Sequence, residues 1–269
     1  MIAGRLTIKT AVIWAVALLA LRTAYAKQSR AVSLEEILER LERNLQDYDR
    51  SIPSFFCDEH LVSEMFPGRR QDVTVADSVF RVKRVENADH STTLVESREF
   101  KGMGAPSSTE FEGPAMIEGI FEGGLAVVSA GQKSCMEYDL QKPKHGTYTI
   151  RFKTRNDPPS PSECLLQEKA HGEAIVDAAS MQITRLELIT PQHTIGGGQN
   201  PWYRPLKGER VVTAEYAPVL LDGKTFWVAS SVTSRVTSDP NTFHSTTWLF
   251  KASYRNFHKL DVTSRMIPQ

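Results

Sequence analysis

The first clear pattern along the chain is a helical repeat of apolar positions that begins after Ser33. Ser33 and Glu36 have the spacing of a capping box, in which a hydroxyl and a carboxylate satisfy the free amides of a first helical turn. Pro53 ends the pattern. The spacing predicts an amphipathic helix over residues 34–49, and we interpret its apolar stripe as a face that packs on the core. The stripe consists of Leu34, Ile37, Leu38, Leu41, Leu45 and Tyr48.

After Pro53 the apolar period changes from about 3.6 residues to two, which is typical of strands with one buried face. Turn residues such as Asp222-Gly223, where both positions tolerate positive φ, separate the segments. Many successive strands without helices between them predict a mainly β fold (α+β) built on an antiparallel sheet. The expected strands begin at residue 54 and cover 54–66, 73–87, 92–101, 132–140, 147–153, 163–168, 172–177, 181–190, 210–218, 226–233 and 247–255.

Three segments interrupt the strand pattern. Gly113-Pro114 is suited to entering a helix, and Ile117, Ile120 and Phe121 would form its buried side, so we expect a short lid helix there. Residues 102–113 read as an irregular connection. The second long connection, residues 191–209, is rich in Gly and Pro and contains Trp202 and Tyr203. Connections this long are uncommon unless they are functional or disordered.

The first 26 residues have the pattern of a secretory signal peptide. Arg5 and Lys9 precede an apolar run from Ala11 to Leu21, and Ala24-Tyr25-Ala26 has the small-x-small form that signal peptidase accepts. The alternative is a membrane anchor, but this run is much shorter than the roughly 20 residues that span a bilayer. We therefore expect residues 1–26 to be removed, residues 27–269 to form a single domain, and the protein to be exported, either periplasmic or secreted.

Charge argues against nucleic acid as a partner. The whole chain has 32 basic and 32 acidic residues, and loss of residues 1–26 removes three basic ones, which leaves 29 against 32 and a net charge of −3. No cluster of basic residues interleaved with aromatic residues occurs along the sequence.

The sequence contains three cysteines, which are Cys57, Cys135 and Cys164. Thiols of exported proteins tend to pair. Only one strand and one turn separate the segments 132–140 and 163–168, so a meander can bring them together. We therefore predict a Cys135–Cys164 disulfide with Cys57 buried and free, although Cys57 could reach either partner.

Residues 57–60, which read CDEH, have the composition of an active site. On a strand, however, adjacent side chains point to opposite faces, so Cys57 and His60 cannot form a nucleophile–base pair. Asp58, His60 and Glu64 share a face, but His60 and Glu64 would lie roughly 13 Å apart along the strand. We interpret these polar residues as a solvated face, and keep a hydrolase or metal site around Asp58, His60 and Glu64 as an alternative.

Motifs of common enzyme and cofactor sites do not occur in this sequence. It contains no GxSxG, HExxH, CxxC, Walker or EF-hand pattern, and its seven histidines are scattered singly. We therefore expect no enzymatic activity, no cofactor and no metal.

Two stretches carry a family resemblance. HGEAIVDAASMQITRLEL (171–188) reads as a hairpin, and YAPVLLDGKTFWVASSVTSRV (216–236) is followed by WLFKASYRNFHKL (248–260). They resemble the late strands of periplasmic lipoprotein carriers of the LolA/LolB type and of the N-terminal domain of the envelope-stress regulator RseB. The resemblance implies an unclosed, curved antiparallel half-barrel whose hollow side is covered by helices and binds acyl chains or lipoproteins.

These observations favour an exported, non-enzymatic protein that binds a lipophilic ligand or a lipidated protein in an apolar groove. The same groove residues could instead simply fill the core. A second hypothesis is an envelope sensor or assembly module that binds a protein partner through loop 191–209, because interfaces favour aromatic anchors. The candidate groove residues are Ile120, Phe121, Ile150, Phe152, Phe226, Val228, Trp248 and Phe250.

Overall fold

The fold is seen in a computed structural model of the 269-residue chain. It describes residues 32–67, 71–88, 92–102, 121, 124–191, 208–238 and 246–260. The expected signal peptide, the lid-helix segment 113–120 and most of loop 191–209 lie outside the described residues.

Helix α2 (Leu34–Ser51) confirms the helix expected from the apolar repeat and runs two residues further. Glu35 and Glu36 occupy its first turn, where negative charge interacts favourably with the positive end of the helix dipole. Arg40 forms an ion pair with Glu36, one turn earlier, at 2.7 Å. Its buried residues, Ile37, Leu38, Leu41 and Tyr48, all belong to the predicted apolar stripe.

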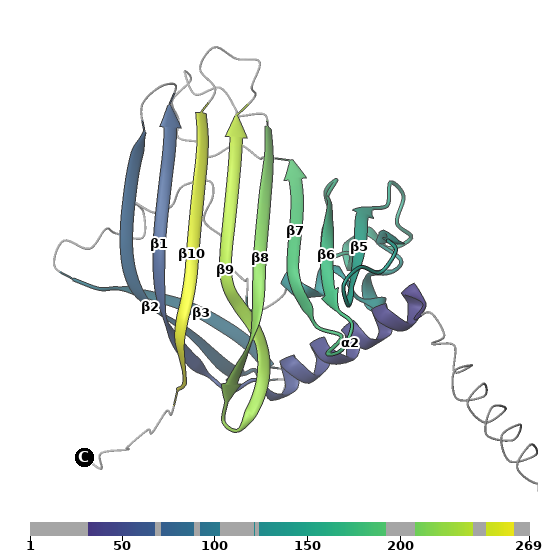
Figure 1. The fold of residues 1–269 in the computed structure, drawn as a ribbon, viewed down its shortest axis with the longest axis horizontal. Helices are drawn as coiled ribbons and strands as arrows, with labels where there is room; N and C mark the ends of the chain where they lie inside the picture. The colour runs from purple at the N-terminus through teal and green to yellow at the C-terminus, as the bar shows by residue number, and fades with distance from the viewer. Residues whose placement is uncertain are drawn as a thin grey trace, which may run out of the picture. The chain divides into compact units, whose positions relative to one another are not determined.

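The strands form one ten-stranded antiparallel sheet (Figure 1). The order across the sheet is β3-β2-β1-β10-β9-β8-β7-β6-β5-β4, so the first strand pairs with the last and neighbours elsewhere are consecutive. The edge strands β3 and β4 do not pair with each other, which confirms the predicted unclosed, mainly antiparallel sheet with an N-terminal helix. The strands are β1 (Phe55–Pro67), β2 (Asp72–Glu86), β3 (Thr92–Phe100), β4 (Met136–Leu140), β5 (Thr147–Thr154), β6 (His171–Asp177), β7 (Ile183–Pro191), β8 (Gly208–Leu221), β9 (Lys224–Ser238) and β10 (Thr246–Lys259).

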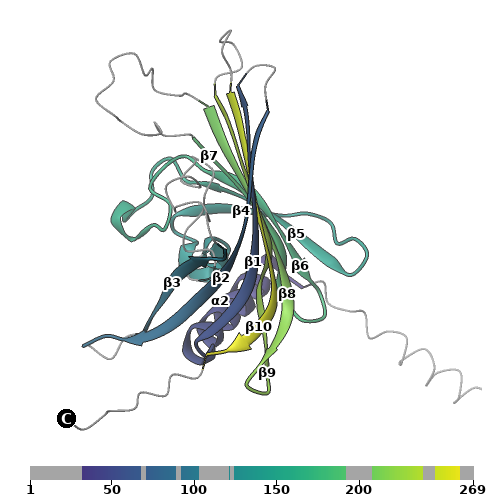
Figure 2. The same ribbon diagram turned by 90° about the vertical axis from the view of Figure 1, so that its left-hand side faces the viewer.

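The sheet is strongly twisted, and helix α2 lies along one of its faces (Figure 2). Burial alternates along the strands as the period of two predicted: Phe55, Cys57 and Leu61 on β1 are fully buried, whereas His60 between them is exposed. The expected hairpin turn at Asp222-Gly223 joins β8 to β9, and both residues have positive φ, 51° and 76°.

The segment 163–168 was predicted as a strand, and this prediction is wrong. A short 3₁₀ helix, Pro161–Glu163, precedes an irregular stretch that leads to β6. Three prolines directly precede this segment, at positions 158, 159 and 161. Proline has no backbone N–H to donate to a neighbouring strand, which disfavours a strand that begins here. Two further 3₁₀ helices, Gly124–Val127 and Ala130–Gln132, precede β4, which begins only at Met136.

Candidate functional site between helix and sheet

A hollow of about 150 Å³ lies between helix α2 and the sheet, and we call it the helix–sheet hollow. Leu41, Leu45 and Tyr48 of the helix form one wall, and Ile183 and Phe226 belong to the sheet. The lining mixes apolar and polar side chains, and a volume of this size is large enough for a benzene-sized molecule. The described residues that line it are Leu41, Asn44, Leu45, Asp47, Tyr48, Leu125, Gln182, Ile183, Lys224, Thr225, Phe226 and Trp227.

Two polar contacts hold the helix above this hollow. The amide of Asn44 donates a hydrogen bond of 2.6 Å to the carbonyl of Met181, in the turn before β7. The ammonium of Lys224, at the start of β9, donates one of 2.7 Å to the hydroxyl of Ser51 in the last helical turn. These contacts lie at different turns of the helix, so they fix its distance from the sheet on both sides of the hollow.

Aromatic residues form the inner part of the hollow. The rings of Tyr48 and Phe226 meet edge to face with centroids 6.4 Å apart. The Lys224 ammonium lies 5.3 Å from the centroid of the Phe226 ring, in cation–π geometry. Burial raises the pKa of Tyr48 far above its ordinary value, so this residue is a neutral phenol at every physiological pH.

Of the predicted groove residues, Phe226 lines the helix–sheet hollow. Trp248 is half-buried, and Ile120 lies outside the described residues. Phe121 packs its ring on those of Phe55, Phe80 and Tyr254. Whether any of them contacts a ligand stays a prediction. The remaining four, which are Ile150, Phe152, Val228 and Phe250, are at most 4% exposed.

A buried ion pair on the same face of the sheet was not found from the sequence. Glu59 on β1 is 1% exposed, and its two carboxylate oxygens accept hydrogen bonds of 2.5 and 2.7 Å from the guanidinium of Arg98 on β3. The Ser78 hydroxyl donates to the same carboxylate, and the guanidinium also lies 5.2 Å from the centroid of the Phe80 ring. Side chains alternate between the two faces of a strand, so Glu59 lies on the buried face with Phe55 and Cys57. This alternation does not identify Arg98 as the residue that pairs with Glu59.

The polar residues of CDEH lie as the strand period predicted, with Asp58 and His60 on the face opposite Cys57. His60 Nδ1 is 2.8 Å from Asp77 Oδ1. Asp58 accepts hydrogen bonds from Lys101, at 2.5 Å, and from Asn256, at 2.8 Å. The contact with Lys101 in particular holds the pKa of the Asp58 carboxyl below its ordinary value.

Asp58 and His60 line an open hollow of about 580 Å³ on this second face, together with Ser253 and Arg255 of β10. Glu64 does not line it and instead accepts a hydrogen bond of 3.3 Å from Gln71. Asp58, His60 and Glu64 are therefore not brought together. Within the ranges that the structure describes, no three His, Cys, Asp or Glu side chains are grouped so that they could hold a metal ion.

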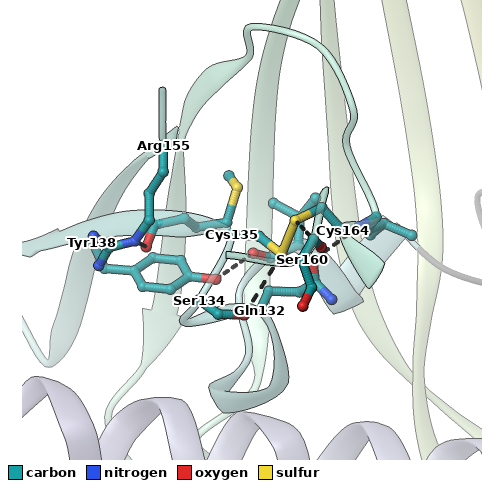
Figure 3. Close-up of a disulfide and its surroundings, with 10 residues drawn as sticks. Gln132, Ser134, Cys135, Tyr138, Arg155, Ser160 and Cys164 are labelled. Atoms are coloured by element: carbon teal, nitrogen blue, oxygen red, sulfur yellow. Dashed lines mark hydrogen bonds between the residues drawn. A yellow bond between two sulfur atoms is a disulfide. The ribbon is translucent and has the colours of Figure 1, made fainter. Parts of the chain in front are cut away.

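Cys135 and Cys164 form a disulfide with Cα atoms 5.5 Å apart, which is the predicted pairing (Figure 3). Tyr138, two residues into β4, donates a hydrogen bond of 2.8 Å to the carbonyl of Val127 beside it. Cys57 is a buried free thiol, and burial raises its pKa to about 12, so it is a poor nucleophile at neutral pH.

Comparison with known proteins gives matches among solved structures alone: no family model and no curated protein sequence matches this chain. A domain assigned to outer membrane lipoprotein-sorting proteins, from Vibrio parahaemolyticus, matches with 9% identity and a TM-score of 0.38, over 81% of this chain and 90% of that one. A LolA superfamily protein from Nitrosomonas europaea matches with 9% identity and a TM-score of 0.34, over 83% and 94%. A DUF1329 family protein from Desulfovibrio piger matches with 11% identity and a TM-score of 0.39, over 84% and 92%. In all three matches the identity is at most 11% and the TM-score at most 0.39.

The remaining predicted feature, loop 191–209, is described only at its ends. Pro191 closes β7, and Gly208 and Glu209 open β8. Residues 192–207, which include Trp202 and Tyr203, lie outside the described residues, so their role in binding a protein partner stays a prediction. Among the described helices, none has the length and apolarity needed to cross a bilayer.

Proposed function

We propose that this chain is an exported binding protein that holds a small lipophilic ligand in the helix–sheet hollow and catalyses no reaction. The observation that carries the proposal is the hollow itself, a space of about 150 Å³ whose apolar part lies between Leu41, Leu45 and Tyr48 of the helix and Ile183 and Phe226 of the sheet. Ligand sites are typically concave and mainly apolar, with a few polar groups that fix orientation. Asn44, Asp47 and Lys224 supply such groups here.

Export is supported by the signal-peptide pattern of residues 1–26 and by the Cys135–Cys164 disulfide. Disulfides persist in oxidising compartments such as the periplasm and the extracellular space. A carrier that works there would meet lipids and lipidated proteins at membrane surfaces.

The volume sets the expected ligand size. A benzene-sized space takes about six carbon atoms of an acyl chain. Burial contributes about 0.8 kcal/mol for each methylene, so such a chain provides about 5 kcal/mol before the cost of association. Because the cost of association is subtracted from this figure, we expect millimolar or weaker affinity for one short chain, and a longer ligand would extend out of the hollow.

Calorimetric titration with straight-chain 1-alkanols from four to ten carbons tests the proposal. The account predicts that affinity rises about fourfold per methylene, the factor that 0.8 kcal/mol gives, until about six carbons are buried and then levels off.

Leu45→Trp fills the hollow and should weaken binding at least tenfold. Leu220→Trp is the matched control, because Leu220 is 68% exposed and does not line the hollow. Absence of alkanol binding by the unaltered protein, or equal binding by the Leu45→Trp variant with an unchanged circular dichroism spectrum, would contradict the proposed function.

A further inference from the structure

Lys224 is held at the helix–sheet hollow in a defined position. Its ammonium donates to the Ser51 hydroxyl at 2.7 Å and lies 5.3 Å from the centroid of the Phe226 ring, which lines the hollow. A lysine side chain loses much rotamer freedom when it is fixed, so a lysine that is already held costs less to engage in a further contact.

The charge of Lys224 is not neutralised by the part of the chain that the structure describes. An ammonium has three N–H donors, and Ser51 accepts one of them. Lys224 forms no ion pair with any carboxylate in the described ranges, whereas Lys259, at the other side of the β8–β9 turn, pairs with Asp222 at 3.0 Å. The hollow is therefore bordered by an exposed cation that has N–H donors beyond the one bound to Ser51.

Asp47 limits how much negative charge the ligand can carry. This residue is exposed, lines the same hollow and lies one helical turn before Ser51. A single negative charge at Lys224 gains from contact with the ammonium, whereas a second charge adds repulsion from Asp47 without a second cation among the described lining residues.

On the basis of the function proposed above, we propose that the ligand of the helix–sheet hollow is a singly charged anionic amphiphile, a carboxylate of the fatty-acid type. Its apolar chain occupies the space between Leu45 and Phe226, and its carboxylate accepts hydrogen bonds from Lys224. Charge complementarity at the border and apolar lining inside match the two ends of such a molecule.

Calorimetric titration at pH 7.5 with octanoate, 1-octanol and octyl phosphate tests this assignment. The three probes share one chain length and differ in head-group charge. We expect octanoate to bind about fivefold more tightly than 1-octanol, which is the magnitude of a partly exposed ion pair, and octyl phosphate to bind more weakly than octanoate. Lys224→Met retains the apolar stem and removes the charge, so the ratio of octanoate affinity to 1-octanol affinity should fall to about one.

Lys259→Met is the matched control and should retain the preference, since Lys259 is absent from the lining of the hollow. Equal affinity for octanoate and 1-octanol in the unaltered protein, or a preference that survives Lys224→Met, would overturn the head-group assignment and leave the lipophilic site intact. Binding of none of the three probes would instead overturn the proposed function, so the two failures are distinguishable.

Discussion

At the scale of single residues, polar groups inside the sheet are as informative as apolar ones. Glu59 is only 1% exposed, and its burial is tolerated because Arg98 binds both of its carboxylate oxygens and the Ser78 hydroxyl donates to one of them. Alternation along β1 puts Glu59 on the same face as Cys57. Its partners could not be predicted, because Arg98 lies 39 residues further along the chain and reaches Glu59 across β2.

The Glu59–Arg98 pair gives a sharp stability prediction. Arg98→Leu leaves an unpaired buried carboxylate and should lower the free energy of unfolding by about 3–5 kcal/mol. The double variant Glu59→Leu/Arg98→Leu removes both charges and should recover most of this loss. Urea denaturation at pH 7 measures all three proteins. If the double variant has no higher free energy of unfolding than Arg98→Leu, the loss in Arg98→Leu does not come from an unpaired buried carboxylate, and the prediction is wrong.

At the scale of elements, the sequence predicted what depends on neighbours along the chain. The helix, the Asp222-Gly223 turn and the period of the strands are local features, and the structure contains each of them. The strand expected at 163–168 is absent, and this segment is irregular. The disulfide does not require a strand there, because an irregular segment also brings Cys164 close to Cys135.

The disulfide should stabilise this irregular segment by restricting the unfolded chain. Its cysteines are 29 residues apart, and loop-closure entropy then gives about 3.6 kcal/mol. We expect the double variant Cys135→Ala/Cys164→Ala to lose about 2–4 kcal/mol of unfolding free energy in urea titration. Cys57→Ala serves as the control for loss of a thiol without loss of a bridge. If dithiothreitol leaves the urea midpoint of the unaltered protein unchanged, the disulfide does not contribute in this way.

At the scale of the whole sheet, the pairing of β1 with β10 joins segments about 200 residues apart in the chain. It places strands β1–β3 beside strands β4–β10 in one sheet. The helix–sheet hollow arises at the same scale, since its walls come from α2, from the turn before β7 and from the start of β9. No local pattern along the chain determines which side chains border such a space. Among the described groove candidates, Phe226 alone lines this hollow.

The location of a bound apolar chain tests the account most directly. Crystals of the protein grown with 6-bromohexan-1-ol allow the bromine to be located by its anomalous scattering. The account predicts a bromine peak between the side chains of Leu45 and Phe226, beneath helix α2. A peak on another surface, or none at millimolar ligand, would contradict it.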